Sequence, residues 1–180
     1  MKQWRRGADD HVVATLERQE AQLLRALVGQ IREILAARSA QAPADELAAI
    51  TGIRTGPSTA PDDRVLARLL PDFTREDPSL AGGLRSLHEP ELIDVKDGVA
   101  ALVLNTCPPD GGRVRLSIEE GHAWLSALND VRLALGTVLE VTEDMPDELP
   151  FDDPMAPHLG VYHWLTYVQE TLVHAMSGQR

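Results

Sequence analysis

The amino-acid sequence predicts a mainly α, single-domain helical bundle of about six helices with a small two-stranded β ribbon. Three long segments repeat apolar side chains at spacings of three and four: Leu16–Arg38, Ile118–Glu140 and Pro154–Met176. A short β-like run that ends in a hydroxyl residue precedes each of the first two segments. The chain has 180 residues, of which 43% are hydrophobic, enough for one domain with its own core.

The helix expected after Ser117 should lie at the centre of this core. Ser117 and Glu120 have the spacing of a capping box, in which the hydroxyl and the carboxylate each bind a backbone N–H at the helix start. The apolar positions that follow, beginning with Trp124, form a broad buried face. We expect Trp164, on the last long helix, to share one core with Trp124.

The first long helix follows an N-terminal region with strand character. The Trp4-Arg5-Arg6 segment is either a small basic and aromatic arm or, more simply, an edge strand. The run His11–Thr15 should be a strand, with Thr15 as the cap of the helix after it. We expect this strand to pair with the one around Val114–Leu116, so that the ribbon sets the two helices side by side.

Between the first two long helices we expect a loop and shorter helices. Residues 39–63 predict a long loop, with a short helix near Asp45–Ile50. Prolines bracket a two-turn helix at Asp62–Leu70. Asp77-Pro78 is a cap followed by a first-turn proline, and the helix that it opens should break or kink at Pro90.

The elements after Pro90 are less regular. Helical spacing resumes at Glu91, and we favour a helix there although Asp97-Gly98 is also a hairpin signal. Cys107–Gly112 predicts a turn. The segment 141–153 is rich in carboxylates and predicts a solvated acidic linker before the last helix.

Three residues form the candidate for an ion pair or a pocket: His88, Glu89 and Arg132. Arg132 falls on the apolar face of the central helix, where an unpaired guanidinium would be costly. We therefore predict that Arg132 is buried and pairs with a carboxylate from the segment 88–94, Glu89 being the first candidate. A hollow lined by all three would indicate an enzyme or small-molecule sensor with His88-Glu89 as an acid–base pair. A filled contact, which we favour, would indicate a structural role.

A row of arginines seven residues apart is the candidate partner surface: Arg18, Arg25 and Arg32. Such a row could contact a protein partner or a phosphate group. The simpler interpretation, which we favour, is a solvated helix face balanced by neighbouring glutamates.

Charge and cysteine content limit the function classes. The net charge of -11 repels phosphate backbones and anionic lipid, so we expect no membrane contact and no direct nucleic-acid binding. Cys107 is the single cysteine, which excludes an intrachain disulfide, and its place after a helix should disfavour the thiolate. The histidines lack the spacing of metal ligands, so we expect no metal and no cofactor. Without a signal peptide or an apolar run that could span a membrane, we expect a cytoplasmic protein.

Four segments carry a resemblance to a known family: Leu66–Phe73, Leu84–Glu91, Asn129–Thr137 and His158–Thr166. Together they resemble an actinobacterial family long classified as a domain of unknown function, also called the oxidative-stress-regulator (AosR-like) family. The resemblance covers nearly the whole chain and brings no catalytic residues. It implies a regulator of oxidative stress or transcription.

From the residues and this resemblance we expect a non-catalytic regulatory protein that acts through protein–protein contacts. Two alternatives stay open: an enzyme or small-molecule sensor near His88, Glu89 and Arg132, and a regulator that binds DNA directly. The identity of the partner and the formation of a homodimer are also open.

Overall fold

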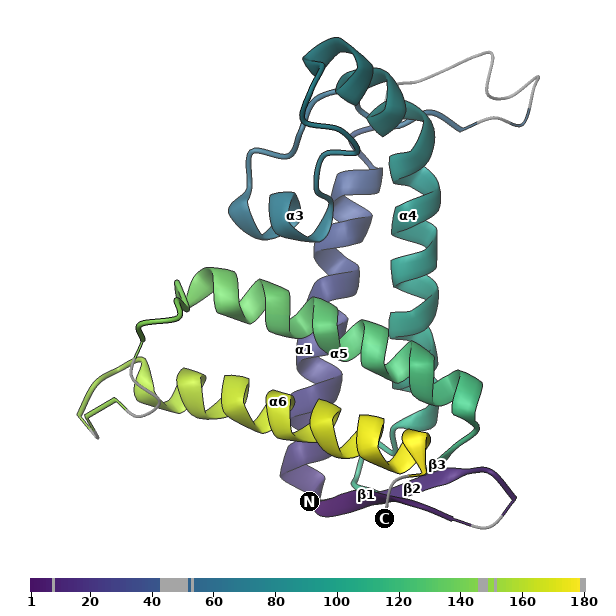
Figure 1. Ribbon diagram of the computed structural model, residues 1–180, viewed down its shortest axis with the longest axis vertical. Coiled ribbons are helices and arrows are strands. Elements are labelled where there is room, and N and C mark those ends of the chain that lie inside the picture. Colours follow the sequence, from purple (N-terminus) through teal and green to yellow (C-terminus); the bar gives the residue numbers. More distant parts are fainter. Residues whose placement is uncertain (8, 43–51, 53, 146–148, 151, 179–180) are drawn as a thin grey trace.

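The computed structural model describes residues 1–7, 9–42, 52, 54–145, 149–150 and 152–178. Within these residues the chain forms five helices and three strands: β1 (Lys2–Arg6), β2 (Val12–Leu16), α1 (Arg18–Ser39), α3 (Arg64–Leu69), α4 (Pro78–Thr106), β3 (Gly112–Leu116), α5 (Ile118–Val138) and α6 (Ala156–Ser177). In Figure 1, α1 and α4 run side by side along the long axis, α5 and α6 cross them as a pair, and the strands lie at one end. The prediction of a mainly helical chain is confirmed, and the single domain stays a prediction.

The strands form one antiparallel sheet in the order β1-β2-β3. The predicted pairing of the two strands that precede long helices is confirmed, since Val12 pairs with Leu116 and Leu16 with Gly112. The ribbon is nevertheless three-stranded, because the Trp4-Arg5-Arg6 segment adds β1 as an edge strand beside β2. Its Trp4 is 3% exposed and belongs to the core, which accounts for the additional strand.

At both strand-to-helix junctions, the glutamate at the third helical position accepts from the N–H of the cap residue. Of these two cap residues, only Ser117 was predicted correctly. Ser117 Oγ accepts from the N–H of Glu120 at 3.1 Å, and Glu120 Oε2 accepts from the N–H of Ser117 at 2.7 Å, as a capping box requires. Thr15 is not the cap of α1, because β2 continues to the buried Leu16. The cap is Glu17, whose N–H donates to Glu20 Oε2 at 2.7 Å.

The predicted break at Pro90 is wrong, because α4 is one helix of 29 residues that includes Pro90, and the alternative of a kink there stays a prediction. Proline has no N–H, so the carbonyl of Ser86, four residues earlier, loses its helical partner. The N–H of Gly56 donates to that carbonyl at 2.7 Å, and Ser86 Oγ donates to the carbonyl of Gly56 at 3.0 Å. A Cβ on residue 56 would lie 3.2 Å from the Pro90 ring, so a larger residue would require the ring or the loop to shift by a few tenths of an ångström. The freed carbonyl thus becomes the docking point of a loop, and two predicted helices merge into one.

The other predicted elements have mixed outcomes. Asp77 caps α4 by accepting from the N–H groups of Ser79 and Leu80, as predicted, and the Asp97-Gly98 segment is helical, not a hairpin. The short helix predicted near Asp45–Ile50 lies outside the described residues, as do residues 146–148 and 151 of the acidic linker. Among the described helices, none has both the length and the apolar character that a membrane span requires.

The core gathers around Trp124, which is fully buried on α5. Its indole N–H donates to Thr106 Oγ1 at 2.8 Å, and its ring meets the Trp4 ring edge to face with centroids 5.4 Å apart. Trp164 packs against the same core while remaining partly exposed, which confirms that Trp124 and Trp164 share one core.

Candidate functional site

The structure separates the three residues predicted to form an ion pair or pocket. Glu89 is fully buried, whereas His88 is exposed beside Phe73, with the ring centroids 5.8 Å apart. Arg132 is half-buried on α5 and donates to Gln169 Oε1 at 2.7 Å and to the Tyr162 hydroxyl at 3.4 Å. None of the ion pairs found in the described part of the chain includes Arg132. The predicted pairing of Arg132 with Glu89 is therefore wrong. Gln169 and Tyr162 of α6 accept from the guanidinium instead, and its buried Nε has no hydrogen-bond partner among the described residues.

Glu89 belongs to a buried network with two other arginines. One carboxylate oxygen accepts from Arg38 Nε at 2.6 Å, and the other accepts from Arg85. The Arg85 guanidinium also binds Asp72 at 2.7 Å. Burial lowers the pKa of Arg85, but its hydrogen bonds to Asp72 and Glu89 outweigh that effect and raise the pKa above its ordinary value. The guanidinium therefore stays charged.

The same two arginines also hold neighbouring loops. Arg38 donates to the carbonyl of Thr59 at 2.6 Å and to Gln41 Oε1 at 3.0 Å, and Arg85 donates to the carbonyl of Leu70 at 3.2 Å. Both oxygens of Glu89 are occupied by guanidinium groups, so the carboxylate is poorly placed to act as a general base. The network is structural: it fixes α1, α4 and the loops between them.

Arg132 borders an open cleft of about 530 Å³ between α3, α5 and α6. Its guanidinium carbon lies 5.2 Å from the centre of the Tyr162 ring, a cation–π arrangement. Two more arginines line the cleft, Arg64 and Arg68, and Arg64 is paired with the Glu140 carboxylate at 2.7 Å. The lining includes no cysteine or histidine, and the described residues hold no cluster of three potential metal ligands. The cleft has the chemistry of weak anion binding, without a recognisable nucleophile and base.

The predicted arginine row of α1 faces the chain itself. Arg18 pairs with Asp110 at 2.8 Å, Arg32 pairs with Asp97 at 2.6 Å, and Arg25 donates to the carbonyl of Cys107 at 2.7 Å. Hydrogen bonding from Arg32 lowers the pKa of the Asp97 carboxyl. The row therefore joins α1 to α4 and the turn after it. The pairing partners lie across the helix interface and are not the glutamates of α1, whereas contact of this row with another protein stays a prediction.

Cys107 ends α4 and is 1% exposed. Burial raises the pKa of its thiol to about 11, although the positive charge of Arg25 opposes the shift. The expectation of a disfavoured thiolate is confirmed.

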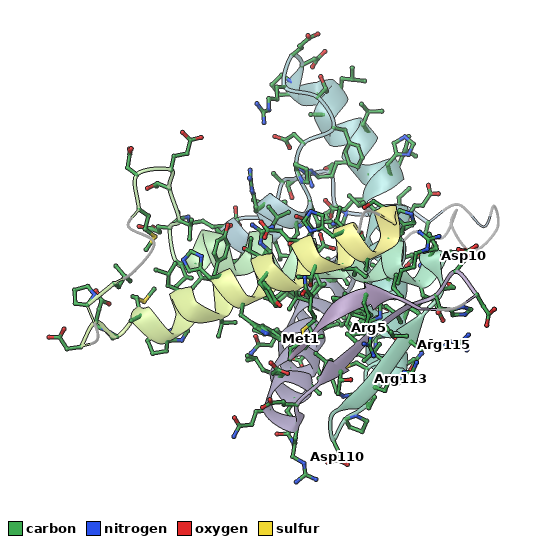
Figure 2. All side chains as sticks on the ribbon, turned by 60° about the horizontal axis from the view of Figure 1, so that its bottom comes forward. Met1, Arg5, Asp10, Asp110, Arg113 and Arg115 are labelled. Atoms are coloured by element: carbon green, nitrogen blue, oxygen red, sulfur yellow. The ribbon has the colours of Figure 1, made fainter. Side chains whose placement is uncertain are left out.

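The sequence analysis missed a basic surface on the sheet. Arg5, Arg113 and Arg115 are exposed, and the strand register places Val13 between Arg5 and Arg115. Figure 2 shows these arginines lying between Asp10, near one end of the sheet, and Asp110, near the other. The sequence pattern that could have predicted this surface is the alternation Arg113-Val114-Arg115-Leu116, which places arginines on one face of a strand and apolar side chains on the other.

Comparisons with known proteins agree with the family resemblance. The family described as "Domain of unknown function (DUF2017)" matches residues 1–176. Proteins called "Oxidative stress regulator AosR" from Mycobacterium tuberculosis and Mycobacterium bovis are each 44% identical over 180 residues, which covers 93% of this chain and 83% of theirs. A "Putative oxidative stress regulator AosR" from Mycobacterium leprae is 42% identical over 170 residues, covering 87% of this chain and 78% of its own. No solved structure matches the chain.

Proposed function

The chain belongs to the DUF2017 family, and we propose that it is a non-catalytic cytoplasmic regulator of the oxidative-stress response that acts by binding protein partners. The role in oxidative stress comes from the names of its mycobacterial relatives. The non-catalytic mode is supported by the separation of His88, Glu89 and Arg132, the residues on which an enzyme or a sensor would have depended.

Binding through protein contacts is supported chiefly by an apolar stripe on the exposed side of α4. Leu80, Leu87 and Val95 are 52%, 53% and 58% exposed, and their spacings of seven and eight residues place them on one helix face. Phe73, 40% exposed, lies beside His88 of α4 and adds to the exposed apolar surface near Leu87. Single exposed apolar side chains are ordinary, but several of them along one side of a helix suit a surface that a partner covers. The exposed acids Glu91 and Asp94 interrupt the row before Val95, so its apolar part is centred on Leu80 and Leu87.

The stripe lies on a helix that is otherwise well anchored. The buried side of α4 carries Arg85, Glu89, Ile93, Ala100 and Val103. In Figure 1 the N-terminal turns of α4 lie at the end of the molecule opposite the sheet. A rigid helix with one apolar side facing outward can enter the groove of a partner without reorganising first.

The experiment combines a stress phenotype with variants of this stripe. A strain of the source bacterium that lacks the gene would be complemented with wild type, with L80S/L87S, or with the control V138S/V173S, which alters two exposed valines on α5 and α6. We expect the deletion to change sensitivity to hydrogen peroxide, and we expect wild type and the control to restore it while L80S/L87S does not. Equal urea midpoints for the purified proteins would show that all of them fold.

Each other outcome has a definite meaning. A deletion without a stress phenotype would contradict the regulatory role. Full restoration by L80S/L87S would place the partner surface elsewhere. Sedimentation of wild type and L80S/L87S also tests the homodimer, because a dimer that dissociates in this variant would identify a second copy as the occupant of the stripe.

A further inference from the structure

We propose that the outer face of the sheet, formed by Arg5, Arg113 and Arg115 around Val13 and Thr15, binds an acidic segment of a partner protein. The inference rests on the proposed function, since it specifies the chemical character of one of the protein partners that this function assumes. It concerns the end of the molecule opposite the N-terminal turns of α4, where the apolar stripe begins.

The strand register assembles this face from parts of the chain that are far apart in sequence. Arg5 on β1 pairs with Val13 on β2, and Val13 pairs with Arg115 on β3, so two arginines flank one valine in a row across the sheet. In the next row on the same face, Arg113 pairs with Thr15. The opposite face is apolar and buried, with Trp4, Val12, Ala14, Val114 and Leu116 in the core. The arginines are thus held on a rigid, twisted platform.

Within the residues that the structure describes, these three arginines lack the carboxylate partners that many other arginines have. Seven other arginines form ion pairs with described Asp or Glu residues: Arg6, Arg18, Arg32, Arg38, Arg54, Arg64 and Arg85. No ion pair in the described part of the chain includes an arginine of the face, and Arg115 only approaches the His11 ring, at 3.3 Å. The unpaired charges are notable because the chain has 28 acidic and 17 basic residues.

The acids around the face do not neutralise it. Asp10 pairs with Arg6 at 2.6 Å, and Asp110 pairs with Arg18 at 2.8 Å, so the two acids at its ends already have partners. Asp9 lines a shallow hollow of about 440 Å³ with Arg113 and Arg115 and is the one acid among that lining. With three arginines and one acid, Asp9, recorded on or beside the face, we expect its local potential to be positive despite the net charge of -11, because charges beyond the Debye length of about 8 Å are screened at physiological salt.

The shape of the face suits an extended acidic segment. Arg113 and Arg115 are two residues apart on one strand, which separates their Cα atoms by about 7 Å. Alternate side chains of an extended peptide have the same separation, so acids at positions i and i+2 could each receive a guanidinium. Guanidinium groups bind carboxylates through two parallel hydrogen bonds, which gives such a contact geometric specificity.

Nucleic acid fits the face less well, although guanidinium also binds phosphate. Proteins that bind DNA tightly commonly make about 6–10 phosphate contacts, whereas this face offers three arginines. A duplex is also larger than the face and would bring further phosphates towards the acidic remainder of the chain. The number of cations therefore favours a short acidic segment of a protein.

Fluorescence anisotropy with the full chain tests the proposal. The probes are a short labelled peptide of alternating Glu and Thr, the matched peptide of alternating Gln and Thr, and a short labelled DNA duplex. The variants are R113E/R115E and the control R54E/R75E, which makes the same change in net charge at two exposed arginines outside the sheet. R113Q/R115Q serves as a second variant that removes charge without reversing it.

We expect the wild type to bind the Glu peptide, more weakly as salt rises, and not the Gln peptide. R113E/R115E should lower that affinity roughly tenfold or more, since two attractive charges become repulsive, and R113Q/R115Q should lower it by less. The control should stay within about twofold. Failure of the wild type to bind the Glu peptide, or an equal loss in the control, would overturn the proposal. Tighter binding to DNA that is lost in R113E/R115E would identify a nucleic-acid surface instead.

The same variants separate this inference from the proposed function. If the deletion strain shows no stress phenotype while the peptide titration succeeds, the regulatory role is wrong and the acidic-segment surface stands. If the phenotype exists and R113E/R115E restores it fully, the regulatory role stands and this face does not serve it.

Discussion

Replacement of Glu89 by alanine should be among the most damaging single changes in this chain. The side chains of Arg38, Glu89 and Arg85 are 4%, 1% and 2% exposed. Without Glu89, Arg38 keeps only neutral hydrogen-bond acceptors, and Arg85 keeps Asp72 and one carbonyl. Breaking a buried ion pair by removing one partner costs roughly 3–5 kcal/mol. With a urea dependence of roughly 2 kcal/mol per molar, the unfolding midpoint should fall by about 1.5–2.5 M.

Two comparisons make this expectation sharp. E140Q removes an acid from an exposed pair with Arg64, whose side chains are 69% and 72% exposed, and should change stability by less than about 1 kcal/mol. The triple variant R38M/R85M/E89L replaces the buried charges with apolar groups and should unfold at higher urea than E89A, although it changes more residues. A midpoint of E89A within error of the wild type, or a triple variant less stable than E89A, would refute this account of the network.

Three further measurements follow from the structure. Trp124→Ala should cost roughly 3–5 kcal/mol in urea denaturation, and Trp164→Ala should cost less, because Trp164 is only partly buried; an unchanged midpoint for Trp164→Ala would make it a surface residue. Arg132→Ala should cost about 1–2 kcal/mol, the scale of a neutral hydrogen bond and a cation–π contact, and a loss as large as that of E89A would contradict this assignment. The pKa of Cys107 is raised from 9.0 to about 11, so its thiolate fraction near pH 8 should be about a hundredfold lower than for an ordinary thiol. Ellman's reagent should therefore label Cys107 slowly in the native state and quickly in urea, and fast labelling of the native protein would show an accessible thiol.

Local chemistry made parts of the fold predictable. The cap formed by Ser117 and Glu120 depends on residues three apart, and that spacing is visible in the sequence. The cap at Asp77 is equally local. The pairing of β2 with β3 followed from two similar strand-to-helix junctions, whose strands could bury their apolar sides against each other.

Choices between distant partners could not be read from the sequence. Glu89 had Arg85 four residues before it, a spacing that brings side chains together on a helix, whereas the other partner, Arg38, comes from the last turn of α1. The continuation of α4 through Pro90 depended on Gly56, which precedes Pro90 by 34 residues in the sequence. The N–H of Gly56 donates to the Ser86 carbonyl that the proline leaves without a helical donor. In both places a long-range contact satisfied a group that local reasoning had left without a partner.

The sheet lies at one end of the long axis, and the N-terminal turns of α4, where the apolar stripe begins at Leu80, lie at the other. Paired helices α1 and α4 separate them, joined by the contacts of Arg25 and Arg32 with the second half of α4 and its end. A ligand on the sheet therefore neither covers the apolar stripe nor needs to displace it, and the two contacts should be energetically independent, as changes at distant sites usually are. L80S/L87S should then bind the acidic peptide as the wild type does. A regulator with this geometry could hold two partners at once, whereas a change in peptide affinity on altering Leu80 and Leu87 would mean that the two ends are coupled through α4.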